Sequence, residues 1–64
     1  MPNTDQRVIN DKIVRKALSN VEEAQGNAVR VIPQSPEEEE GIETVKNSLR
    51  IAKMALVNML RSHI

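Results

Sequence analysis

The side chains in this sequence that could do chemistry are one histidine, one acidic run and one basic stripe. His63 is the only imidazole in the sequence, and there is no cysteine to serve as a nucleophile or a metal ligand. Acid–base and nucleophilic catalysis need a second group held beside the first, and zinc sites need three or four protein ligands. We therefore predict no catalytic residue, no metal site and no cofactor, and we expect that the protein is not an enzyme.

The acidic run extends from Glu37 to Glu40. Successive residues of a helix point in different directions, so these four carboxylates cannot converge on one cation, and no calcium-loop spacing surrounds them. Ser35 and Pro36 precede the run and are typical of a helix start, where acidic side chains also suit the helix dipole. We expect the Ser35 hydroxyl to accept a hydrogen bond from the Glu38 amide, and the Glu38 carboxylate to reach back to the Ser35 amide.

The basic stripe consists of Lys46, Arg50 and Lys53 on the same predicted helix. Nine basic and nine acidic residues balance to a net charge of zero, and there is no Phe, Tyr or Trp to stack on bases. The balanced charge argues against nucleic acid as a partner, but it does not exclude a local basic patch that binds nucleic acid. No apolar run is long enough to span a membrane and the N-terminus does not resemble a signal peptide, so we expect a cytoplasmic protein without a membrane partner.

Two helices must position these side chains, one over residues 5–25 and one over residues 35–63. The first has an apolar stripe on one side, and Gly26 followed by Asn27 is typical of a left-handed helix stop. The second follows a heptad repeat, in which apolar residues alternate at spacings of three and four. We predict that this repeat is a self-association seam formed by Ile42, Val45, Leu49, Ala52, Leu56 and Met59.

The predicted fold is all-α, with a single domain over residues 1–64 that forms a two-helix hairpin. A chain of this size without aromatic residues buries little surface alone, so we expect two hairpins to associate into a four-helix bundle. Glu22 and Glu23 would join residues 37–43 at an acidic loop end, and basic residues would gather at the open end. Two rods in opposite directions would match these charges. Residues 28–32 contain the β-branched Val29, Val31 and Ile32 and could form a short strand or a linker.

We predict a small regulatory or adaptor protein that acts by protein–protein interaction as a homodimer, with an unidentified protein partner. The partner would meet the charged ends, or a face formed by Ile51, Met54, Ala55 and Asn58. A third interpretation is a chain that folds only on meeting its partner, because weak cores favour coupled folding and binding.

The alternative function depends on a different arrangement of the same residues. If residues 29–32 paired with their counterpart in a second copy, and the long helix broke near Asn47 and Ser48, the order strand, helix, helix would resemble the ribbon-helix-helix fold. The run over residues 51–60 is loosely similar to the second helix of that fold. This resemblance implies a dimeric DNA-binding transcriptional regulator, with affinity for DNA that falls steeply with salt.

Overall fold

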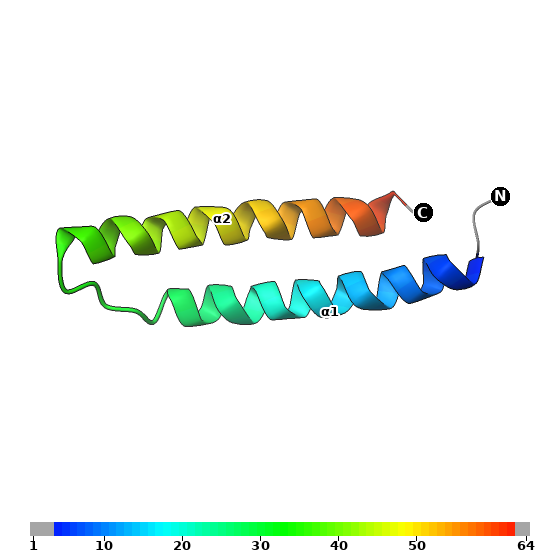
Figure 1. Cartoon of the computed structure of the whole chain (residues 1–64), viewed down its shortest axis with the longest axis horizontal. Coiled ribbons are helices and arrows are strands. Elements are labelled where there is room, and N and C mark those ends of the chain that lie inside the picture. The colour runs from blue at the N-terminus through cyan, green and yellow to red at the C-terminus, as the bar shows by residue number, and fades with distance from the viewer. Residues whose placement is uncertain (1–3, 63–64) are drawn as a thin grey trace.

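The computed structural model describes residues 4–62, with side chains described for residues 5–62. These residues form two helices, α1 (Thr4–Ala28) and α2 (Pro36–Arg61), which run antiparallel and are joined by residues 29–35 (Figure 1). The described part of the chain contains no β-strand. The predicted all-α helical hairpin is therefore confirmed, as a rod of 53 by 14 by 14 Å.

The start of α2 follows the predicted capping pattern with one difference. Ser35 has an extended backbone (φ −155°, ψ 162°), Pro36 is the first helical residue, and the Glu38 amide donates to the Ser35 hydroxyl at 3.2 Å. The Glu38 carboxylate, however, accepts from the Gln34 amide at 3.3 Å and from the Ser35 hydroxyl at 3.4 Å. It thus satisfies a backbone donor one residue earlier than the Ser35 amide that we expected.

The end of α1 differs from the prediction, because the helix continues through Gly26 and Asn27 to Ala28. No described residue has a positive φ, so the left-handed stop is not formed. Ala28 is one of the two buried residues, at 5% exposure, and its contact with α2 favours the extra turn. The next amides bond locally, from Val29 to the Gln25 carbonyl at 3.2 Å and from Arg30 to the Asn27 carbonyl at 3.1 Å.

These local bonds also decide between the strand and the linker predicted over residues 28–32. The Val31 amide donates to the Ala28 carbonyl at 3.3 Å, so the amides that a strand would offer to a neighbour are used within the turn. The segment is a linker between the helices. Since α2 also continues unbroken through Asn47 and Ser48, the described residues have neither the strand nor the helix break that the ribbon-helix-helix arrangement requires.

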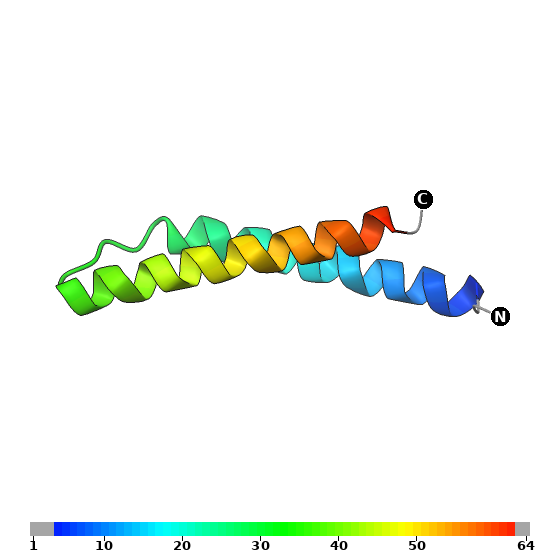
Figure 2. The same cartoon turned by 90° about the horizontal axis from the view of Figure 1, so that it is seen from above.

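The two helices are staggered along the rod. Figure 1 and Figure 2 show that the first turns of α2 project past the end of α1, and that the first turns of α1 project past the end of α2. An ion pair of 3.8 Å between Lys53 Nζ and Glu22 Oε2 marks the register of the two helices. Glu22 therefore lies level with the second half of α2, and not beside residues 37–43 as we expected from a hairpin with flush ends.

Candidate interaction surface

The contact between the two helices is a narrow seam with few buried side chains. Along each helix, a stripe with alternating spacings of three and four residues is buried or half-buried. The stripes consist of Asp11, Val14, Leu18, Val21, Gln25 and Ala28 on α1, and of Ile42, Lys46, Leu49, Lys53, Leu56 and Leu60 on α2. Four of these twelve residues are polar, and among the described residues only Val14 and Ala28 are buried, at 6% and 5% exposure. The seam therefore holds the hairpin together with a thin core.

The predicted self-association seam is divided between two surfaces in the structure. Ile42, Leu49 and Leu56 belong to the stripe that meets α1, so the hairpin itself uses them. Val45 and Met59 are exposed at 45% and 49%. The α2 stripe passes through Lys46 and Lys53, whereas the apolar heptad pattern predicts the adjacent Val45 and Ala52. α2 is therefore rotated slightly from the predicted orientation, and Val45 and Met59 face one flank of the hairpin.

That flank carries no charge between Gln6 and Asn27 of α1 or between Gly41 and Ser62 of α2, and the next position along it, in the first turn of α2, is Glu38. Seen from one end of the rod, the residues of α1 follow one another clockwise or anticlockwise, and those of the antiparallel α2 follow one another in the opposite direction. The side chains one position before each residue of the seam therefore lie on the same flank for both helices. We call the fourteen positions of this flank between Gln6 and Asn27 and between Gly41 and Ser62 the neutral face. It consists of Gln6, Asn10, Ile13, Ala17, Asn20, Ala24 and Asn27 on α1, and of Gly41, Val45, Ser48, Ala52, Ala55, Met59 and Ser62 on α2.

The opposite flank has the reverse character. Eight of its fourteen equivalent positions are charged, whereas the neutral face has none, so charge divides the hairpin lengthwise. We call this side the charged face; it consists of Asp5, Val8, Lys12, Arg15, Ser19, Glu22 and Gly26 on α1, and of Glu40, Glu43, Asn47, Arg50, Met54, Val57 and Arg61 on α2. The Glu43–Lys46 pair at 3.8 Å lies along it. A lengthwise division of this kind is expected of a helix pair with one solvated side and one side that meets another apolar surface.

Charge also differs between the two ends of the rod. Residues 29–45, at the loop end, contain five acidic residues and one basic residue. The open end, formed by residues 4–17 and 53–62, contains six basic and two acidic residues. The predicted acidic and basic ends are therefore present, although Glu22 and Glu23 are not part of the loop-end cluster.

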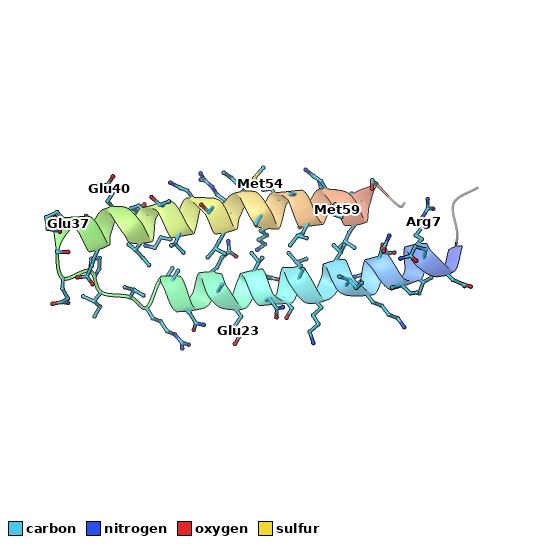
Figure 3. All side chains as sticks on the ribbon, viewed as in Figure 1. Arg7, Glu23, Glu37, Glu40, Met54 and Met59 are labelled. Atoms are coloured by element: carbon cyan, nitrogen blue, oxygen red, sulfur yellow. The ribbon has the colours of Figure 1, made fainter. Side chains whose placement is uncertain are left out.

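The predicted partner face lies on the outer side of α2 and is divided by its neighbours. Met54 points away from α1 in Figure 3, and Met54 and Asn58 line a shallow depression of about 250 Å³ together with Lys53, Val57 and Arg61. Ile51, exposed at 64%, and Ala55 do not line it. Ala55 belongs to the neutral face, with Ile51 at its edge. A second depression, of about 380 Å³, lies on α1, where Ile13, Ala17 and Asn20 of the neutral face line it together with Lys12 and Lys16.

The residues considered for chemistry are placed as follows. His63 lies outside the described residues. The carboxylates of residues 37–40 surround the first turn of α2, and in Figure 3 the Glu37 and Glu40 side chains project from it in different directions. Within residues 4–62, no three His, Cys, Asp or Glu side chains are grouped as metal ligands. Neither described helix has the length and apolar character of a membrane-spanning segment.

Comparison of the chain with protein-family models, with curated proteins and with solved structures finds no match. A proposal about function must therefore come from the chain's own residues. The neutral face is the largest feature that the sequence reasoning missed. Its signal was present in the sequence, as two series of uncharged residues at a spacing of seven in each helix.

Proposed function

We propose that this chain is a non-enzymatic regulatory or adaptor protein that acts by protein–protein interaction as a homodimer, in which two hairpins form a four-helix bundle. The observation that supports this proposal is the large surface that one hairpin leaves exposed. Its accessible area is 5295 Å², whereas a compact monomer of 7.2 kDa exposes about 4,100 Å². The excess of about 1,200 Å² per chain exceeds the roughly 800 Å² that each partner buries in a standard interface.

The chemical nature of this surface supports the same proposal. Ten large hydrophobic side chains are exposed in the described residues, on both helices and in the linker. Scattered apolar residues are normal on a protein surface, but here they outnumber the two buried ones, and so a single hairpin gains little from hydrophobic burial. Three of these side chains, Ile13, Val45 and Met59, lie on the neutral face, where a second copy would bury them. The charged ends and the outer face of α2 stay available to a protein partner.

The test is sedimentation equilibrium of the purified chain over a range of concentrations. We expect a mass of twice 7.2 kDa, with dissociation only on dilution. Far-ultraviolet circular dichroism of the same samples should show high helix content, because both helices are long and joined by a short linker. A folded helical monomer at every concentration would overturn the dimer. A chain with little helix would instead favour folding coupled to a partner.

A further inference from the structure

We propose that a second copy of this chain packs on the neutral face, with the two rods in opposite directions and with α2 crossing its counterpart near Ala52. This inference rests on the proposed homodimer and adds to it the face, the direction and the crossing point. Three properties of the structure lead to it: the distribution of charge around the hairpin, the sizes of the side chains along the face, and the distribution of charge along the rod.

The absence of charge marks this face as one that is covered. Eleven of the fourteen neutral-face positions are exposed in the single hairpin, and since charged residues make up 28% of the chain, eleven solvated positions would carry about three charges at that frequency. The neutral face carries none, whereas the equivalent positions of the charged face carry eight. Charged side chains are costly to remove from water, and their exclusion from one lengthwise strip of both helices is expected where an interface forms.

The side chains along α2 favour a helix crossing near Ala52. Ser48, Ala52 and Ala55 are small and permit close approach of two helices, while Val45 and Met59 are larger and lie seven residues to either side of Ala52. If α2 runs antiparallel to its counterpart about Ala52, then Val45 of each copy meets Met59 of the other. Both side chains are about half exposed in the single hairpin, so this contact would cover them.

Charge along the rod selects the direction. With the rods antiparallel, the acidic loop end of one copy lies beside the basic open end of the other. With the rods parallel, five carboxylates from each copy would meet at one end. The antiparallel arrangement also places each α1 beside its own counterpart, so that α1 and α2 contribute separate halves of the interface.

Single cysteines test this arrangement, because the natural chain contains none. The variants are Ala52→Cys at the proposed crossing, Val45→Cys and Met59→Cys on either side of it, and Met54→Cys on the charged face, two residues from Ala52, as the control. Each is oxidised under mild conditions as the full chain, and the disulfide-linked dimer is quantified by non-reducing electrophoresis. Circular dichroism checks that each variant is folded.

We expect efficient self-crosslinking of Ala52→Cys, with about tenfold less for Met54→Cys, where only collisions form the bond. Val45→Cys and Met59→Cys should each fail alone and crosslink when mixed. A residue seven positions from the crossing lies about 10 Å along the axis from it, which separates identical residues by about 20 Å and brings residues 45 and 59 together. A disulfide requires Cα atoms within about 7 Å.

The outcomes separate this inference from the dimer itself. Equal crosslinking of Met54→Cys and Ala52→Cys, or failure of Ala52→Cys in a protein that sediments as a dimer, would overturn the neutral face while the homodimer stands. Self-crosslinking of Val45→Cys as strong as that of Ala52→Cys would overturn the antiparallel crossing. A natural chain that sediments as a monomer would overturn the homodimer and this inference together.

Discussion

At the residue scale, the most sharply defined interaction is the cap of α2. The Ser35 hydroxyl accepts from the Glu38 amide at 3.2 Å and lies 3.4 Å from the Glu38 carboxylate, to which it donates. We predict that Ser35→Ala lowers the free energy of unfolding by about 1 kcal/mol, the typical cost of an N-cap lost to alanine. Urea denaturation followed by circular dichroism, at one fixed protein concentration, measures this difference.

Ser35→Asp is the matched control, because a carboxylate oxygen can replace the hydroxyl as the acceptor for the Glu38 amide. It should stay within a few tenths of a kcal/mol of the natural chain, with a small cost from its repulsion with Glu38. If Ser35→Asp and Ser35→Ala lose the same stability, the hydrogen bond to the helix amide is not what stabilises this end of α2. The first turn would then be held by Pro36 and the helix dipole.

At the scale of the elements, two valines of α1 report whether the seam stabilises the hairpin. Val14 is 6% exposed and lies in the stripe against α2, while Val8 is 48% exposed, on the part of α1 that precedes the overlap. We predict that Val14→Ala lowers the free energy of unfolding by about 2 kcal/mol, from two lost methyl groups and the cavity that they leave. Val8→Ala should cost less than about 0.5 kcal/mol, because its side chain is already in water.

These two variants share a helix, a residue type and a substitution, so their difference isolates burial. Thermal or urea unfolding at equal protein concentration provides the comparison. Equal losses at both positions would show that a contact other than α2 covers Val8, which belongs to the charged face. Equal and negligible losses would mean that the seam contributes little and that stability comes from elsewhere.

The elements themselves were predictable, but the orientation of α2 was not. Ser35, Pro36 and the acidic run identify the start of α2 from local chemistry, and the apolar spacing identifies both helices. The stripe that meets α1, however, passes through Lys46 and Lys53, two residues that an apolar pattern assigns to solvent. Their long apolar stems can lie along the seam while the amines reach water, and one of them pairs with Glu22.

The end of α1 and the stagger of the helices depend on contacts that no local pattern contains. Gly26 and Asn27 have the chemistry of a helix stop, yet the burial of Ala28 against α2 extends the helix past them. The separation of Glu22 from the acidic loop end follows from the length of the linker and the register of the seam. The uncharged series of the neutral face are present in the sequence, but the series of α1 and α2 can be assigned to one flank only once the orientation of α2 is known.

At the scale of the whole molecule, the proposed homodimer predicts a stability that depends on protein concentration, because a single hairpin is an extended rod with a thin seam. The radius of gyration is 15.4 Å, against about 10.7 Å for a compact domain of this length. If folding is completed by a second copy, the Tm must rise with protein concentration. A hundredfold increase contributes about 2.7 kcal/mol per dimer, which corresponds to a rise of about 10 °C for the two chains together.

A pair of charge variants decides whether the neutral face is responsible for that dependence. Ala52→Glu places a carboxylate in the middle of the neutral face, whereas Asn47→Glu adds the same side chain to the charged face, where it remains in water. Ala52→Glu should lower the Tm and remove its dependence on concentration, because an unpaired charge cannot be buried between two copies. Asn47→Glu should keep the dependence of the natural chain. Calorimetry at two concentrations measures all three proteins. A Tm of the natural chain that is independent of concentration would mean that one hairpin reaches its stability alone, and its uncharged face would then require an explanation other than a second copy.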